Sequence, residues 1–266
     1  SMQNRQGTKE HNGEIIKRGE VITLDRCIDI ALKKHPNIVA AGSTVAINKS
    51  RIGQAEANYY PHIDLSGGYS RIHSASDASR SAGSSNPYDQ YNTGINLKQN
   101  IYDFGKTSAQ RTIQRFNMEG SRSDLENTVT QIVFVVRQAY YTLLQTMRSR
   151  TVAEETVKQF QRHLEQAKGF FEVGTKPRFD VTRAEVDLST AGLNLIKAEN
   201  AVRLAMVNLN NAMGVRDAPA YSIEDTLSFQ RYPITIGDAV LKAFENRPDI
   251  KASGARRKAA EENITL

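Results

Sequence analysis

The 266-residue sequence contains no tryptophan and only one cysteine, Cys27. A single cysteine excludes an internal disulfide framework and any zinc centre built from several cysteine ligands. The sequence has no run of about 18 apolar residues, the length that a membrane-spanning helix needs. Its five histidines are scattered, and no two have the spacing of metal ligands on one helix. Helix and strand patterns are therefore the main source of information.

The sequence is basic and otherwise has the composition of a folded protein. It contains 35 Lys and Arg against 29 Asp and Glu, a net charge of +6, and 39% of its residues are hydrophobic. These fractions exclude a chain that is disordered throughout. A positive charge suits either a nucleic acid partner or a basic helical surface. Lys and Arg are spread along every predicted helix and do not gather on one face with aromatics between them, so we predict no nucleic acid partner.

The two ends of the sequence differ in pattern. Residues 1–20 are polar, lack periodicity and contain no apolar core of a signal peptide, which predicts a flexible leader. Ser1 and Met2 resemble a cloning scar. Residues 252–266 have the pattern of a helix, but no Gly, Asn or Pro follows to end it. We therefore expect this chain to be a truncated form of a longer protein.

A short internal repeat is the most informative pattern. Residues 22–42 recur, at one constant offset and without a gap, as residues 234–254. In both copies a Thr can cap a short amphipathic helix, and a Pro then stands near the first turn of the next helix. We predict a first repeat over residues 21–232 and the start of a second over 233–266. The identical positions of the first copy are Ile22, Thr23, Ala31, Pro36, Ile38, Ala40 and Gly42.

Two stretches inside the first repeat have a strand period. Residues 37–58 predict a helix that ends before Pro61, because proline cannot continue the hydrogen-bond ladder of a helix. Polar and apolar residues then alternate near 62–71 and near 91–102, which predicts two strands. A Ser-, Ala- and Gly-rich loop over residues 72–90 separates them. The chain is thus predicted to be mainly α with a two-strand β insertion, for which an ordinary surface hairpin is the simpler interpretation.

Two long helices follow. Residues 106–173 contain no Pro and carry apolar residues in steps of three and four, which predicts one helix on the order of 100 Å long. Gly174 and Pro177 end it. The returning helix alternates Ala with Val or Leu in a heptad pattern, which predicts a closely packed antiparallel coiled coil, and residues 215–232 then form a linker. The seam residues are Val181, Ala184, Leu188, Ala191, Leu195, Ala198, Val202, Ala205, Leu209 and Ala212.

No pattern in the sequence predicts catalysis. There is no glycine-rich phosphate loop, no nucleophile elbow and no pair of zinc-binding histidines on a helix. Glu154 lies four residues before Lys158, so a solvated ion pair explains this acidic residue. Cys27 lies on the apolar face of the first short helix, and we predict that it is packed rather than reactive. We predict a protein that is not an enzyme and has no catalytic residues, metal or cofactor.

In this order, the elements resemble the TolC family of bacterial outer membrane efflux proteins, the channel components of tripartite efflux and secretion systems. The resemblance covers nearly everything from residue 21 to 266. One departure lies at the helical hairpin tip, where Gly169 and Phe170 stand where the family often has an Arg, one turn before the tip glycine. The matching segments are ITLDRCIDIALKKHPNI, YYPHIDLSGGYS, QNIYDFGK, FEVGTKPRFDVTRAE, LNNAMG and the opening of the second repeat, ITIGDAVLKAFENRPDI.

The resemblance implies half of a protomer that combines an α-helical barrel with a β-barrel. In this family a homotrimer forms a passive conduit, in which a helical tunnel crosses the periplasm and a β-barrel crosses the outer membrane. Each repeat supplies two strands to that barrel, and the 72–90 loop would lie outside the cell. The implied candidates for outer membrane lipid contact are Ile63, Leu65, Tyr69, Thr93, Ile95 and Leu97.

The resemblance also implies partners for the helical hairpin tip. There the family meets a periplasmic adaptor protein, which links it to an inner-membrane pump, so Val173, Gly174, Thr175 and Asp180 are candidate docking residues. From its position, Asp180 is expected to be the N-cap of the returning helix. The implied location is the cell outer membrane with a large periplasmic portion, the signal peptide being absent from this sequence.

A periplasmic coiled-coil adaptor or scaffold without a pore is the alternative function. The two strands argue against it, because adaptors carry lipoyl-like β-domains instead of two isolated strands beside a polar loop. The cargo, the class of pump, a lipid anchor and the oligomeric state of this chain stay open.

Overall fold

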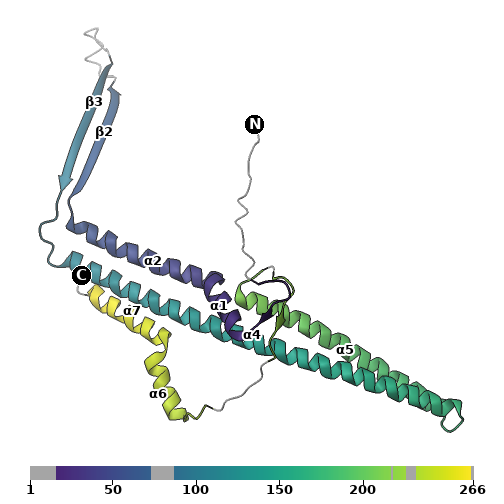
Figure 1. The fold of residues 1–266 in the computed structure, drawn as a ribbon. Helices are drawn as coiled ribbons and strands as arrows, with labels where there is room; N and C mark the ends of the chain where they lie inside the picture. The colour runs from purple at the N-terminus through teal and green to yellow at the C-terminus, as the bar shows by residue number, and fades with distance from the viewer. Residues whose placement is uncertain (1–15, 73–86, 217, 226–231, 265–266) are drawn as a thin grey trace. The chain divides into compact units, whose positions relative to one another are not determined.

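In the computed structural model (Figure 1), the described residues are 16–72, 87–216, 218–225 and 232–264. The chain divides into two compact units. Unit 1 contains residues 1–43 and 123–249, and unit 2 contains residues 44–122 and 250–266.

The predicted fold class is confirmed, because helices dominate and one strand pair interrupts them. Among the described residues, no helix is both long and apolar enough to cross a membrane. In chain order (Figure 1), the elements are β1 (Val21–Ile22), α1 (Leu24–Lys34), α2 (Pro36–Glu56), η1 (Ala57–Tyr59), β2 (His62–Ile72), β3 (Tyr88–Lys98), α4 (Lys106–Glu172), α5 (Arg178–Met213), β4 (Ser222–Ile223), α6 (Ile236–Asn246) and α7 (Pro248–Ile264).

The predicted coiled-coil seam is confirmed within unit 1. Helix α4 has 67 residues, about 100 Å of helix, and α5 has 36. Every residue of the predicted α5 seam is buried or half-buried, whereas the positions on the opposite side of α5 are exposed. Ala205 and Leu209 of α5 share a cluster with Val136 and Tyr140 of α4.

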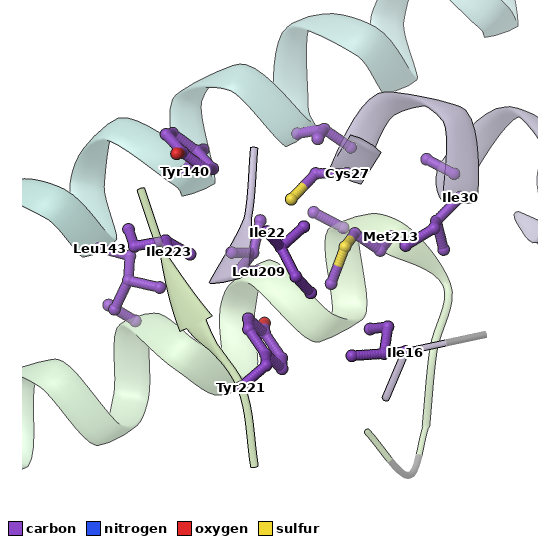
Figure 2. Packing of buried hydrophobic residues seen from close by; sticks show 14 of the residues in the cluster. Ile16, Ile22, Cys27, Ile30, Tyr140, Leu143, Leu209, Met213, Tyr221 and Ile223 are labelled. Atoms are coloured by element: carbon purple, nitrogen blue, oxygen red, sulfur yellow. The ribbon is translucent and has the colours of Figure 1, made fainter. Parts of the chain in front are cut away.

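The core of unit 1 lies where α1 meets α4 and α5 (Figure 2). Ile22, Cys27 and Leu209 are fully buried there. Strand β4 pairs in parallel with β1, and the Tyr140 hydroxyl donates a hydrogen bond of 2.8 Å to the carbonyl of Glu224. The linker predicted for residues 215–232 is therefore wrong in part, because residues 221–225 are held against the core.

Residues 16–20, at the start of the described chain, are fixed in place although the sequence predicts a flexible leader through residue 20. Ile16 is 1% exposed and belongs to the core cluster of unit 1. The backbone N–H of Gly19 donates to the carbonyl of Ala220 at 2.8 Å. A leader that is flexible through residue 20 is thus wrong for residues 16–20, because one apolar side chain and a backbone bond fix them.

Unit 2 has a smaller and more polar interior. The buried Asn48 of α2 donates a side-chain hydrogen bond to Ser121 of α4. Helix α7 buries only alanines, at positions 252, 255 and 259. A methyl group on Gly120 of α4 would lie 3.8 Å from the Cβ of Ala255. Small and amide side chains thus replace the large apolar side chains that fill unit 1.

Candidate functional site

In the strand insertion, β2 and β3 form an antiparallel pair (Figure 1). Their register is continuous, from His62 opposite Lys98 to Ile72 opposite Tyr88. Its two strands are the whole sheet, so each has one backbone edge that no described strand pairs. Exposed edges of this kind favour association with further strands.

The register brings all six predicted lipid-facing residues to one face of the pair. Ile63 lies opposite Leu97, Leu65 opposite Ile95, and Gly67 opposite Thr93. Because side chains alternate along a strand, residues of the same parity share a face. Leu65 and Ile95 are each 75% exposed, so this apolar face has no cover within the described chain.

One residue of this apolar face was missed from the sequence. Tyr91 lies opposite Tyr69, and their ring centroids are 5.1 Å apart. The signal was available, because Tyr91 precedes Thr93 by two positions and therefore belongs to the same face. The Tyr69 hydroxyl also donates a hydrogen bond of 2.9 Å to Asp89, so the aromatic pair ends at a polar group.

The other face of the strand pair is polar. At one end of it, the ring Nε2 of His62 lies 3.0 Å from a carboxylate oxygen of Asp64. Farther along, a methyl group on Gly68 would lie only 2.6 Å from the side-chain oxygen of Asn92. Glycine at position 68 therefore makes room for an amide on this face. The hairpin as a whole is amphipathic across its thickness.

The helical hairpin tip closes through a glycine, as predicted. Gly174 has a φ of +77°, and the N–H of Thr175 donates to the carbonyl of Phe170 at 2.9 Å. These are the left-handed C′ residue and the long-range bond of a Schellman motif. Val173 and Phe179 are 72% and 70% exposed, so the turn presents apolar side chains to its surroundings.

The predicted role of Asp180 is wrong. Helix α5 begins at Arg178, its N-cap is Pro177, and no side chain caps it. Asp180 lies in the first turn, where its carboxylate is 3.8 Å from the ammonium group of Lys176. A negative charge there is favourable because it faces the positive end of the helix dipole. Pro177 takes the cap position because its fixed φ starts the helix and it has no N–H to satisfy.

The residues that replace the family's Arg near the tip are aromatic and glycine. Phe170 is 40% exposed, and the Lys176 ammonium lies 5.5 Å from its ring centre. A methyl group on Gly169 would meet no atom within 4 Å, so this glycine is not required by close packing. The cation–π contact ties the turn to the end of α4.

Helix α5 carries a second apolar stripe that we did not predict from the sequence. It lies on the side of the helix opposite the buried seam, and its members are 52% to 66% exposed. Heptad spacing, which located the first seam, would have located this one too. The stripe consists of Val186, Leu193, Leu204 and Val207.

The grooves found among the described residues of unit 1 are shallow and open. One of them, of about 580 Å³, runs along α4 past Tyr141, Arg148 and Val152. Burial raises the pKa of the Cys27 thiol to about 12, which is the environment of a packed cysteine and not of a reactive one. Within the described ranges, no three His, Cys, Asp or Glu residues are grouped as metal ligands.

Long paired helices with an Ala-rich seam and an amphipathic two-strand insertion define the fold as that of an outer membrane channel protomer. The chain belongs to the outer membrane efflux protein family, whose model matches residues 27–215. Its sequence is 26% identical to outer membrane protein TolC of Vibrio cholerae over 187 residues, which are 70% of this chain and 42% of that protein. It is also 26% identical to the alkaline protease secretion protein AprF of Pseudomonas aeruginosa, over 71% of this chain and 38% of that protein.

Solved structures show the same fold. The CusC structure matches with a TM-score of 0.75 and 18% identity, over 91% of this chain and 55% of that one. The Campylobacter jejuni CmeC outer membrane channel gives a TM-score of 0.75 and 18% identity, over 91% and 52%. The predicted family and half-protomer fold are therefore confirmed, and the adaptor alternative is not favoured. The chain spans about half the length of the relatives that it matches.

Proposed function

We propose that this chain is part of a subunit of an outer membrane channel, which acts as a passive conduit for a tripartite efflux or type I secretion system and has no catalytic step of its own. The observation that carries the proposal is the amphipathic β2–β3 hairpin. Its exposed apolar face suits lipid and its polar face suits a water-filled lumen.

A lone hairpin cannot cross a membrane, because its unpaired edges would leave backbone groups without hydrogen bonds in lipid. Closure needs strands from other repeats and other copies of the chain, which is why we propose a homotrimeric β-barrel. Ile63, Leu65, Tyr69, Thr93, Ile95 and Leu97 would face outer membrane lipid in it. The predicted loop over 72–90 is shorter than expected, because Ile72 ends β2 and Tyr88 begins β3. The segment between the two strands, whose residues 73–86 lie outside the described chain, would be extracellular.

The two stripes of α5 support the same assembly. The buried stripe contacts α4, and the exposed stripe around Leu204 has no cover within the described chain. A helix with apolar stripes on opposite sides can have a neighbour on each side. A closed ring of helices needs that arrangement, so we propose that α4 and α5 contribute to a periplasmic tunnel.

We propose the helical hairpin tip as the adaptor-docking site, through Val173, Gly174, Thr175 and Asp180. Its exposed apolar residues and rigid turn support this role. The adaptor would connect the channel to an inner-membrane pump. Secretion stays beside efflux in the proposal because one relative, AprF, is by its name a protease secretion protein.

For the domain organisation we propose a first repeat that extends to about residue 232 and a second that opens at about 233. The described structure supports this division, because α1 and α6 begin behind equivalent Thr caps. The location would be the outer membrane, with the helices in the periplasm.

The test is membrane insertion of the natural full-length protein with one charge placed on either face of the hairpin. Leu65→Arg puts a cation into lipid at a cost of about 2–4 kcal/mol, so we expect loss of outer membrane trimer and of conductance in planar bilayers. Asn96→Arg, on the polar face, is the matched control and should retain both. Equal behaviour of the two variants, or a parent protein without conductance, would contradict the proposal.

A further inference from the structure

The polar face of the β2–β3 hairpin carries its charges at one end. His62 and Asp64 lie on this face at the start of β2, and Lys98, at the end of β3, is opposite His62 in the register. Residues two apart on a strand share a face, and directly opposite residues have Cβ atoms about 4.5–5.5 Å apart. Three side chains that can carry a charge are therefore neighbours. We call His62, Asp64 and Lys98 the charged trio.

Within β2 and β3, the rest of the polar face has no charge at neutral pH. It consists mainly of hydroxyl and amide side chains and glycine. The Ser66 hydroxyl donates to the carbonyl of Gly94 at 3.3 Å, and Gly68 lies opposite Asn92. The charged trio therefore dominates the electrostatics of this face. The remaining uncharged members of the face are Ser70, Ile72, Tyr88, Gln90 and Asn96.

The other charges of the two strands lie on the opposite, apolar face. Arg71 and Asp89 lie there beyond the Tyr69–Tyr91 pair, and a guanidinium nitrogen is 3.8 Å from a carboxylate oxygen. These two charges have opposite signs and point away from the polar face. They provide a comparison for the trio, because they belong to the same strands and differ in the face that they occupy.

The charged trio is open to water and its backbone is held in place. The side chains of His62 and Asp64 are 77% and 56% exposed, and Lys98 is exposed too. Gln99, the residue after Lys98, donates from its side-chain amide to the carbonyl of Tyr59 at 3.2 Å. This bond connects the chain that enters the hairpin to the chain that leaves it, so the trio stays in register.

The net charge of the trio depends on the proton of one side chain. With a neutral His62 imidazole, the charges of Asp64 and Lys98 cancel. With a protonated imidazole, the trio has one net positive charge. Histidine is the side chain that ordinarily gains its charge between about pH 8 and pH 5. The charged groups that face it are Asp64 of its own strand and Lys98 of β3, and β2 pairs with no other described strand.

A charge of this kind matters most beside a water-filled lumen. Rings of charged side chains determine which ions enter a pore, and rings of positive charge favour anions. The low dielectric of the surrounding wall concentrates the field in the water. A homotrimer would repeat the trio once in each subunit, at the same level of the lumen. One proton per subunit would then change the sign of the solute that is favoured.

We propose that the charged trio is an ion-selectivity site of the lumen, which is neutral when His62 is unprotonated and attracts anionic solutes when His62 is protonated. This inference rests on the proposed function, because it assumes that the polar face of the hairpin lines a water-filled lumen. It adds to that function a class of solute, anions, that the channel favours in acid, and the residues that select it.

The test is the reversal potential of the natural full-length protein in planar bilayers at pH 8 and at pH 5. A gradient of potassium chloride is used that does not exceed about 0.1 M, where a charge acts over about 10 Å. The potential gives the ratio of chloride to potassium permeability. For the parent protein we expect this ratio to rise about twofold from pH 8 to pH 5.

Four variants assign the change to the trio. His62→Gln should lose the rise, and any rise that it keeps comes from other titrating groups. Lys98→Gln should lower the ratio about twofold at both pH values, and Asp64→Asn should raise it by a similar factor. Arg71→Gln is the matched control, because it removes a charge from the same strand but from the opposite face. It should leave the ratio unchanged at both pH values.

A charge placed chemically at position 62 gives an independent measurement. His62→Cys is treated at pH 8 with a cationic methanethiosulfonate reagent, which attaches a permanent positive charge to the new thiol. We expect the ratio at pH 8 to rise to about the value of the parent at pH 5. The parent treated with the same reagent is the control, because its Cys27 is buried.

The results that contradict the inference differ from those that contradict the proposed function. A His62→Gln channel that keeps the whole rise, or a Lys98→Gln channel with the ratio of the parent, would overturn the selectivity site while the conduit survives. A parent protein that gives no conductance would overturn the proposed function itself.

Discussion

Helices α1 and α6 open the two copies of one sequence motif, residues 22–42 and 234–254. They have the same local structure, but their surroundings differ. Each is an 11-residue helix whose N-cap Thr accepts a hydrogen bond from the backbone N–H three residues later. Each ends at an extended residue, His35 or Arg247, that is followed by a Pro opening the next helix. The agreement extends from the caps to the backbone angles at both ends.

The difference lies in burial. Helix α1 buries Cys27, Ile30 and Ala31 in the core of unit 1, whereas α6 has no buried residue. Ile236 and Phe244 on the apolar face of α6 are 86% and 65% exposed. The Thr caps and the spacing of apolar residues therefore determine that each helix forms. Packing against α4 and α5 determines whether its apolar face is buried.

Helices α2 and α7, the second helices of the two copies, also differ in the residues that they bury in unit 2. Helix α2 directs Asn48 at Ser121 of α4, whereas α7 places Ala255 against Gly120, one residue away on α4. The position equivalent to Ala255 in α2 is Ser43, which is exposed. The two helices thus bury different faces, because they carry different side chains at the positions that meet α4.

The largest effect is expected where the two copies differ most in burial. Ile30 is 2% exposed, and its equivalent in the second copy is Lys242, which is exposed. Ile30→Lys would bury an unpaired charge, so we expect unit 1 to lose about 4–5 kcal/mol of stability. Urea denaturation followed by circular dichroism measures the change.

The reciprocal substitution Lys242→Ile is the matched control. It should change stability by at most about 0.5 kcal/mol, because Lys242 is exposed and the described contacts of its ammonium group are with the ring and hydroxyl of Tyr232, which is exposed too. Equal losses from the two substitutions would mean that α6 is packed as firmly as α1, and the contrast between the copies would fail.

Much of the fold follows from local patterns in the sequence. Thr23 and Pro36 predict the ends of α1, and strict alternation places Leu65 and Ile95 on one face of the hairpin. Features that depend on distant partners do not follow. Strand β4 forms because Ser222 and Ile223 find β1, and Ile16 is ordered because it reaches the core. Neither segment has a sequence period that predicts these contacts.

The candidate site divides in the same way. Gly174 is predictable because a helix that must turn needs a left-handed residue, and its φ of +77° agrees. The N-cap at Pro177 is not predictable from the sequence, because Asp180 has the residue type that is preferred at an N-cap. The left-handed backbone of Phe104, with a φ of 54°, is also not predictable, because an aromatic residue in a connecting segment belongs to no sequence period.

A second prediction compares two glycines with similar φ and different neighbours. Gly214 ends α5 with a φ of +73°, and a methyl group there would lie 3.0 Å from the Cα of His35 at the α1–α2 junction. Gly174 has no atom within 4 Å of such a methyl. We expect Gly214→Ala to cost about 2–4 kcal/mol and Gly174→Ala about 1 kcal/mol. Thermal unfolding of the two variants measures the difference. Equal shifts of the melting temperature would show that the contact between Gly214 and the α1–α2 junction does not depend on close packing.

A third prediction uses the two caps. Thr23→Ala and Thr235→Ala each remove a cap bond, to Arg26 and Asp238 respectively, and each should cost its own helix about 1 kcal/mol. Amide hydrogen exchange in the first turn should accelerate about fivefold in both. Only Thr23→Ala should also lower the urea midpoint of unit 1, because α1 belongs to the core and α6 does not. A lowered midpoint in Thr235→Ala would contradict this division.

The effect that is smallest at neutral pH concerns the thiol that only the first copy has. Burial raises the pKa of Cys27 from its ordinary 9.0 to about 12, whereas the equivalent position of α6 is Ala239. The folded state therefore keeps the thiol proton that the unfolded state loses above pH 9, so this contribution to stability is complete below pH 9 and declines as the pH rises towards 12. We expect the urea midpoint of the parent to fall between these values more steeply than that of Cys27→Ala. Iodoacetamide at pH 8 should label native Cys27 at least about tenfold more slowly than the unfolded chain. Labelling at the unfolded rate would mean that α1 opens as freely as an uncovered helix such as α6, and the burial that separates the two copies would not hold in solution.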